Sequence, residues 1–138
     1  MAYISTEEVR AIRKELKNTF PSMRFSVRKR YHLGVTVSIL SGDRDFSDIE
    51  IRNFITDEVI PFSGYMQINH YHLYKYGKHE EFFQKIVDVI KTAPAQVPGG
   101  KAWYDNSDVM SDYFNTAFYF DIEIGNKNQY SHTESLNK

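Results

Sequence analysis

The chain has 138 residues, a net charge of −1 and apolar and charged fractions of 41% and 25%, which are typical of one globular domain with its own core. It contains no cysteine, no apolar run that could span a bilayer and no apolar N-terminal segment. Disulfides and zinc–thiolate sites are therefore excluded, and we expect a cytoplasmic protein that is not bound to a membrane.

The first predicted element is an amphipathic helix that begins after Ser5. Ser5 and Glu8 have the spacing of a capping box, and Ile4 before the cap fits a hydrophobic staple. Pro21 cannot continue a helix, so the element ends just before it. Its apolar stripe comprises Val9, Ile12, Leu16 and Phe20.

Two strands joined by a basic hairpin loop are predicted next, at residues 23–28 and 35–39, because apolar and polar side chains alternate there. The arginines of the first strand should face away from the helix. That face is either a solvated surface or an anion-binding stripe, since arginine makes forked contacts with phosphate and carboxylate groups. The candidate nucleic-acid or anion-binding residues are Arg24, Arg28, Lys29 and Arg30.

The middle of the chain is predicted to add two strands and a second long helix. We expect a third strand at Ser47–Phe54, a loop at Thr56–Gly64, and a fourth strand at Tyr65–Tyr71 with a bulge or bend near Asn69. Apolar side chains with helical spacing predict the helix at Lys78–Thr92.

The last predicted unit is a short helix at Asp108–Tyr113 followed by a strand in which Phe118, Phe120, Ile122 and Ile124 alternate with polar side chains. This alternation is the strongest strand signal in the chain. Residues 1–125 should form a single domain, and residues 126–138 should form a flexible tail. The predicted fold class is α+β: an antiparallel sheet of about four to five strands with two long helices on one face, in the order α-β-β-(β)-β-α-β.

Two groups of side chains are candidate metal ligands. His70 and His72 would share one face of a strand, with His79 as a third ligand for zinc or nickel. Asp105, Asp108 and Asp112 would suit magnesium or calcium, but their spacing is not that of a calcium loop. We expect neither a metal nor another cofactor.

The acidic, tyrosine-rich segment from Trp103 to Tyr119 is better interpreted as a binding surface, because exposed tyrosines are favoured interface anchors. The chain contains no nucleophile elbow and no phosphate-binding glycine loop, so enzyme activity is not expected. The candidate partner-binding residues are Tyr104, Asp105, Asp108, Asp112 and Tyr113.

Three stretches together carry a family resemblance: YISTEEVRAIRKELKNTFPSMRFSVR, QINHYHLYKY and WYDNSDVMSDYFNTAFYFDIEIG. The chain resembles the large polyvalent-protein-associated domains, number twenty-nine of that series, which occur in proteins of phages, plasmids and other conjugative elements. The resemblance implies an α+β domain carried by mobile elements. It implies no catalytic residues.

The leading hypothesis is a non-enzymatic accessory protein of a mobile element that binds a protein partner, in its concrete form an inhibitor of a host defence system similar to an anti-CRISPR. Charge favours an alternative: residues 1–44 carry +5 and the remainder −6, so the basic part is suited to bind nucleic acid. A metal-dependent enzyme is the second alternative. The sequence does not identify the partner or the oligomeric state.

Overall fold

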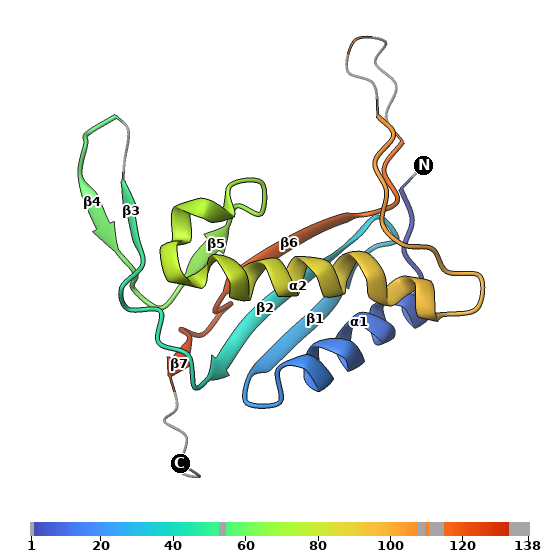
Figure 1. The fold of residues 1–138 in the computed structure, drawn as a ribbon, viewed down its shortest axis with the longest axis horizontal. Coiled ribbons are helices and arrows are strands. Elements are labelled where there is room, and N and C mark those ends of the chain that lie inside the picture. Colours follow the sequence, from blue (N-terminus) through green and yellow to red (C-terminus); the bar gives the residue numbers. More distant parts are fainter. Residues whose placement is uncertain (1, 53–54, 108–109, 111–114, 133–138) are drawn as a thin grey trace.

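The computed structural model describes residues 2–52, 55–107, 110 and 115–132, and it confirms the α+β class (Figure 1). A main sheet carries two α-helices, and a two-stranded hairpin lies outside that sheet. In chain order the elements are α1 (Thr6–Thr19), β1 (Arg24–Arg30), β2 (Gly34–Gly42), β3 (Glu50–Arg52), β4 (Val59–Pro61), β5 (Met66–Ile68), the 3-10 helix η1 (Leu73–His79), α2 (Glu80–Thr92), the 3-10 helix η2 (Ala93–Gln96), β6 (Tyr119–Ile124) and β7 (Ser131–His132).

Helix α1 confirms the predicted start signals. The backbone N–H of Glu8 donates to Ser5 Oγ at 3.1 Å, and the backbone N–H of Ser5 donates to Glu8 Oε1 at 2.9 Å, which completes the capping box. Ile4 is fully buried, as a hydrophobic staple requires. Val9, Ile12 and Leu16 are buried along one side of the helix, so local sequence and tertiary packing favour the same structure.

The main sheet is mixed, which corrects the prediction of an antiparallel sheet. Its order is β1-β2-β6-β5, with β7 paired to the end of β2. Strands β1 and β5 pair antiparallel with their neighbours, whereas β2 and β6 run parallel, from Gly34 opposite Tyr119 to Ile39 opposite Ile124. Alternation indicates which side chains face the core but not the direction of the partner strand. The long connection between β2 and β6 includes α2, and a parallel pair needs such a crossover.

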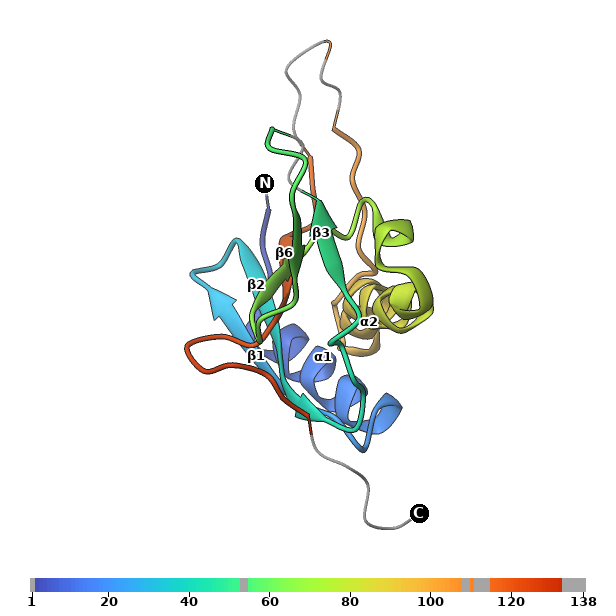
Figure 2. The same cartoon turned by 90° about the vertical axis from the view of Figure 1, so that its left-hand side faces the viewer.

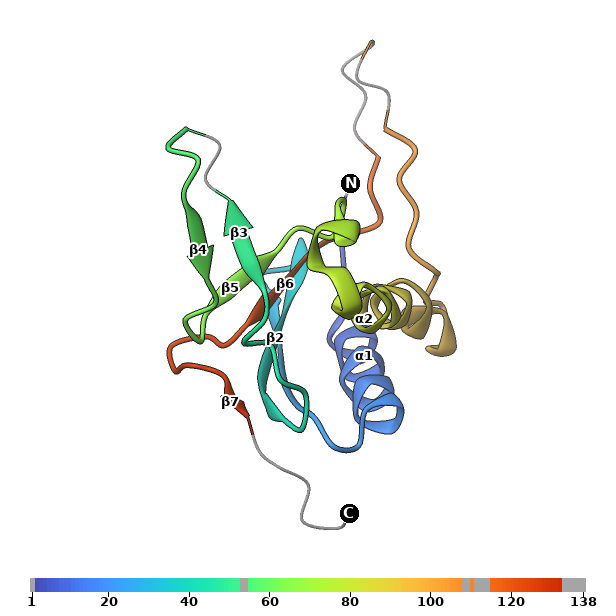
Figure 3. The same cartoon turned by 60° about the vertical axis from the view of Figure 1, so that its left-hand side comes forward.

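Both helices lie on the same side of the main sheet (Figure 3), and no helix of the described residues covers its other face, which we call the open face. The strand register arranges the side chains in rows that alternate between the two faces. One buried row runs across four strands and comprises Val27, Val37, Ile122 and Ile68. The next row, on the open face, comprises Ser26, Ser38, Glu123 and Gln67. The apolar row faces the helices, so the polar row is the one available for binding.

The hairpin formed by β3 and β4 differs from its prediction. The third strand begins at Glu50 rather than Ser47 and is described over Glu50–Arg52, next to residues 53–54 that lie outside the described part of the chain, and its antiparallel partner β4 lies in the segment predicted as a loop. Phe46 and Ile49 are buried just before β3 and attach the hairpin to the core. The β3–β4 hairpin extends away from the body of the molecule (Figures 1 and 2).

The predicted fourth strand and second helix are both shorter than expected. Strand β5 ends at Ile68, and the chain bends at Asn69, whose side-chain oxygen accepts the backbone N–H of Tyr71 at 3.0 Å. The bend near Asn69 is therefore confirmed. Helix α2 begins at Glu80 because residues 73–79 form η1, which is interrupted by the left-handed backbone of Gly77.

Strand β6 confirms the strand predicted near the C-terminus, while the predicted helix at Asp108–Tyr113 falls almost entirely outside the described residues. Residues 126–132 return to the sheet: β7 pairs with β2, and the Tyr130 hydroxyl donates to the carbonyl of Arg44 at 2.7 Å. The Tyr130 ring lies 4.8 Å from that of Phe46. Within the part of the chain that the structure describes, no helix has the length and apolarity needed to cross a membrane.

Candidate functional site

The predicted basic stripe is divided between the two faces of β1. Lys29 lies on the helix side, where its ammonium donates to Thr6 Oγ1 of α1 at 3.0 Å. Arg24, Arg28 and Arg30 alternate with it and are exposed. Arg28 and Arg30 therefore share the open face of the sheet, and Arg24 is exposed at the start of β1, where the register with β2 shifts.

Carboxylates from β6 face two of these arginines. Arg30 forms an ion pair with Asp121 at 2.8 Å, while Arg28 lies 3.7 Å from Glu123. A nitrogen–oxygen hydrogen bond is about 2.7–3.2 Å long. Arg30 is therefore hydrogen-bonded to Asp121, whereas Arg28 is near Glu123 but too far away for a hydrogen bond. Sequence reasoning missed both pairs, because they depend on β2 and β6 lying side by side. The one indication in the sequence is that the acidic residues of β6, Asp121 and Glu123, alternate with its apolar residues and so share one face.

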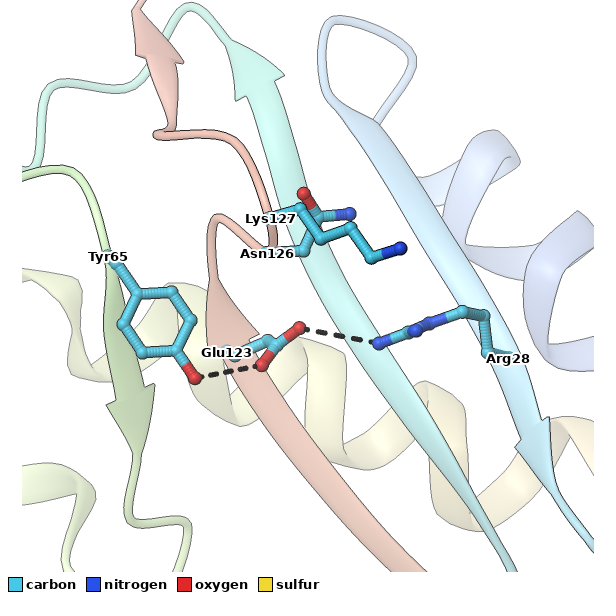
Figure 4. Close-up of a pocket in the computed structure, with 5 residues that line it drawn as sticks. All are labelled: Arg28, Tyr65, Glu123, Asn126 and Lys127. Carbon is cyan, nitrogen blue, oxygen red and sulfur yellow. Dashed lines mark hydrogen bonds and ion pairs between the residues drawn. The ribbon is translucent and has the colours of Figure 1, made fainter.

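A pocket of about 370 Å³ lies on the open face beside Arg28 (Figure 4). We call it the sheet pocket. Glu123 lies between Tyr65 on one side and Arg28 on the other, and Lys127 extends over Arg28 from the turn after β6 (Figure 4). It is lined by Arg28, Tyr65, Glu123, Asn126 and Lys127.

Glu123 is the fixed centre of this pocket. Its side chain is only 13% exposed, and its two oxygens accept different hydroxyls: Ser38 at 2.5 Å on Oε2 and Tyr65 at 3.2 Å on Oε1. Burial, and then the charge of Glu123, raises the pKa of the Tyr65 hydroxyl above its ordinary value of 10.0. Tyr65 therefore stays protonated at neutral pH and remains a donor to Glu123.

A second candidate surface surrounds the turn between β1 and β2. Tyr3, Tyr31, Leu33 and Tyr119 are between 49% and 86% exposed, and we call them the turn cluster. Backbone hydrogen bonds join these segments: the N–H of Tyr119 donates to the carbonyl of Leu33 at 2.9 Å, and the N–H of Ile4, which follows Tyr3, donates to the carbonyl of His32 at 2.9 Å. The Tyr3 ring stacks on His32 with the ring centres 5.9 Å apart. This cluster is therefore an exposed, largely aromatic surface on a hydrogen-bonded backbone.

Tyr31 is the most exposed member of the cluster, at 86%. Its φ of 55° lies in the left-handed region, which is uncommon for a residue other than glycine and costs free energy. The turn thus holds a large aromatic side chain in solvent with a strained backbone, which is more typical of a binding residue than of a structural one.

One of the predicted partner-binding residues lies next to the turn cluster. The carbonyl of Tyr104 accepts the backbone N–H of Ala117 at 2.9 Å, and the carbonyl of Ala117 accepts that of Tyr3 at 2.9 Å. Asp105 accepts from the Ser107 backbone, and a hydrogen bond with Ser107 lowers the pKa of Asp105. The remaining predicted residues, Asp108, Asp112 and Tyr113, lie outside the described part of the chain.

The two candidate histidines do not share a strand, since β5 ends at Ile68. His70 stacks on Phe120 with ring centres 4.2 Å apart, and burial, followed by the charge of Lys91, lowers its pKa from 6.5. His72 instead contacts Tyr74. Among the described residues, no three His, Cys, Asp or Glu side chains are placed to hold a metal ion.

The structure also reveals a polar network that the sequence did not predict. His79 is 1% exposed and lies between Asp48 Oδ1, 2.7 Å from its Nε2, and Arg44 Nη1, 3.1 Å from its Nδ1. A guanidinium only donates, so Nδ1 accepts and Nε2–H donates to Asp48. This hydrogen bond is the main reason that the pKa of Asp48 is below its ordinary 3.8. The network joins the segment after β2 to the start of α2 and has a structural role.

Comparison with known proteins identifies the family. The family described as "Large polyvalent protein associated domain 29" matches residues 4–96, about two thirds of the chain. The match includes the opening and middle stretches that carry the resemblance, and Trp103–Gly125 lies beyond it. No curated protein and no solved structure matches the chain. The family associates the chain with phages and other mobile elements. The chain therefore belongs to the large polyvalent protein associated domain 29 family.

Proposed function

We propose that this chain is a non-enzymatic accessory protein of a mobile element that binds a protein partner through the turn cluster. The observation that carries the proposal is the exposure of Tyr3, Tyr31, Leu33 and Tyr119 around one hydrogen-bonded turn. Tyrosine supplies a large contact area with few rotatable bonds, and it is enriched among residues that dominate binding energy. Arg30, next to Tyr31 in the chain, and its partner Asp121 add a charged rim.

In its concrete form, the proposal is that the partner belongs to a host defence system and that binding inhibits it. Its support is the association of the family with mobile elements, which are the targets of such systems. Expression in a host that carries one defined defence system tests this form. Plating efficiency of a targeted phage should rise with the wild-type chain and return toward the control value with Tyr31→Ala.

Site-specific photocrosslinking tests the proposed surface directly. A photoreactive phenylalanine analogue at Tyr31 should yield a discrete crosslinked protein in that host. The same analogue at Tyr74, which is 65% exposed in η1, is the matched control. With a purified partner, Tyr31→Ala should weaken binding by about 30-fold, as expected for a hot-spot residue. Equal crosslinking from both positions, or equal affinity of the variant, would contradict the proposal.

The nucleic-acid alternative has weaker support. Arg30 is paired with Asp121 at 2.8 Å, and Lys29 points toward α1, so the predicted stripe does not present four free cations. Any such binding should weaken steeply with salt, because it releases counterions from the phosphates. Equal retention of a nucleic-acid probe by the wild type and by an Arg24→Ala/Arg28→Ala variant would exclude these arginines as a nucleic-acid-binding site.

A further inference from the structure

The sheet pocket contains charged, polar and aromatic side chains that the proposed protein binding at the turn cluster does not use. Its volume of about 370 Å³ is in the range of small-molecule sites, which begins near 300 Å³. It lies on the open face of the sheet, and none of its five lining residues belongs to the turn cluster.

The cationic side of the pocket consists of Arg28 and Lys127. Because Arg28 is 3.7 Å from Glu123 and its side chain is 58% exposed, its guanidinium retains N–H donors for a ligand. Among the described residues, no carboxylate is paired with Lys127. Two cations on one side of a pocket favour an anion, and the fork of arginine fits phosphate.

Asn126 adds an oriented donor on the same side. Its side-chain oxygen accepts the backbone N–H of Asn128 at 3.0 Å, so the amide nitrogen is left to donate into the pocket. Its backbone N–H donates to the carbonyl of Asn128 at 3.0 Å, which fixes the turn that carries Lys127. The cationic side is therefore held by a closed turn.

The other half of the pocket suits a polar ring and an aromatic base. Glu123 is an acceptor whose charge is already compensated by the Ser38 and Tyr65 hydroxyls and by the nearby Arg28, so it repels a phosphate less than a bare carboxylate does. Its remaining lone pairs can accept sugar hydroxyls. The Tyr65 ring is held through its hydroxyl and is 48% exposed, which leaves a face for stacking.

We infer that the sheet pocket binds a nucleoside monophosphate, with the phosphate at Arg28 and Lys127, the ribose hydroxyls at Glu123 and the base against Tyr65. The order of these groups across the pocket, cations, carboxylate and aromatic ring, matches the order of phosphate, sugar and base in the ligand (Figure 4). The inference is independent of the proposed protein binding, because it concerns different residues.

Isothermal titration calorimetry with AMP, adenosine and inorganic phosphate tests the inference. AMP should bind with a Kd of about 10 µM to 1 mM, as a ligand of its size can. Adenosine and inorganic phosphate should each bind at least about tenfold more weakly, since each lacks one half of the contacts. No heat of binding with AMP, or equal affinity for adenosine, would overturn the inference.

Variants identify the pocket as the site. Arg28→Gln should weaken AMP binding by at least about tenfold, the loss expected for one charged hydrogen-bonding group. Arg24→Gln removes an exposed arginine of the same strand outside the pocket and should change the Kd by less than about twofold. Tyr65→Ala should weaken binding by about tenfold, and Tyr65→Phe, which keeps the ring, by less. Circular dichroism checks that each variant is folded, and equal affinity of Arg28→Gln and wild type would overturn the inference.

Discussion

The helix-covered face of the main sheet is built from apolar side chains, whereas its open face is built from charges and hydroxyls. Under the helices, Ile39 and Ile122 of the sheet and Phe83 of α2 are fully buried in the hydrophobic core. On the open face, Glu123 accepts two hydroxyls and Arg30 pairs with Asp121. The two faces share the same strands, so every second residue serves stability and the others are available for recognition.

This difference has an energetic consequence. Burial of apolar area stabilises in proportion to the area removed from water, whatever the partner, so the covered face tolerates only changes that preserve volume. Exposed ion pairs contribute little to stability, so the open face can be changed at low cost. Variants of the open face can therefore test function without unfolding the chain.

The largest effect is expected in the core between the covered face and the helices, at Phe83 of α2. Its ring stacks on Phe46 at 5.8 Å and meets Tyr76 at 5.3 Å, and the side chain is fully buried. Phe83→Ala should lower the free energy of unfolding by about 3–5 kcal/mol, because it leaves a cavity. Urea denaturation measures the change, with Phe83→Leu as a control of smaller loss. A loss below about 1 kcal/mol for Phe83→Ala would show that this face is not tightly packed.

A smaller effect is expected from changes to the polar network of Asp48 and His79. His79 is a buried polar residue at the edge of the apolar core. The hydrogen bond from His79 lowers the pKa of Asp48 below 3.8. A carboxyl group with a lowered pKa stabilises the fold above its unfolded pKa, and that contribution is lost as the pH falls through the folded pKa. Asparagine at position 48 does not titrate. The free energy of unfolding of Asp48→Asn should therefore fall less than that of the wild type when the pH is lowered from 5 to below 3.8, the ordinary pKa of an aspartate.

Urea denaturation at several pH values measures this difference. His79→Asn is the matched variant, because it removes the partner that lowers the pKa of Asp48 most. Both variants should show a shallower acid limb than the wild type. If both had the wild-type slope below pH 3.8, the Asp48–His79 bond would not exist in solution.

The covered face could largely be predicted from the sequence, because its signals are local. The capping box of Ser5 and Glu8, the apolar stripe of α1 and the alternation of β6 each lie within a few residues. Each local signal specifies which side chains face inward, and the structure confirms them. The bend near Asn69 was also predictable, since the apolar parity changes there.

The open face could be predicted only in part, because its contacts join distant residues. Arg28 was identified from its position on β1, but Glu123 lies 95 positions further along the chain and meets it only through the parallel pairing of β2 with β6. That pairing requires a close approach: a Cβ on Gly34 would lie 2.5 Å from the carbonyl oxygen of Tyr119. The left-handed backbone of Tyr31 has no reliable sequence signal either.

The smallest effect is expected on the open face, at the ion pair of Arg30 and Asp121. Their side chains are 47% and 39% exposed, so water and salt screen the attraction even at 2.8 Å. A double-mutant cycle of Arg30→Gln and Asp121→Asn should give a coupling energy of no more than about 1 kcal/mol, and less in 0.5 M salt. Urea denaturation of the four proteins measures it. Arg24→Gln with Asp121→Asn is the control cycle and should show no coupling. A coupling well above 1 kcal/mol would mean that the open face stabilises the fold as the covered face does, and that its charges are not free to serve recognition.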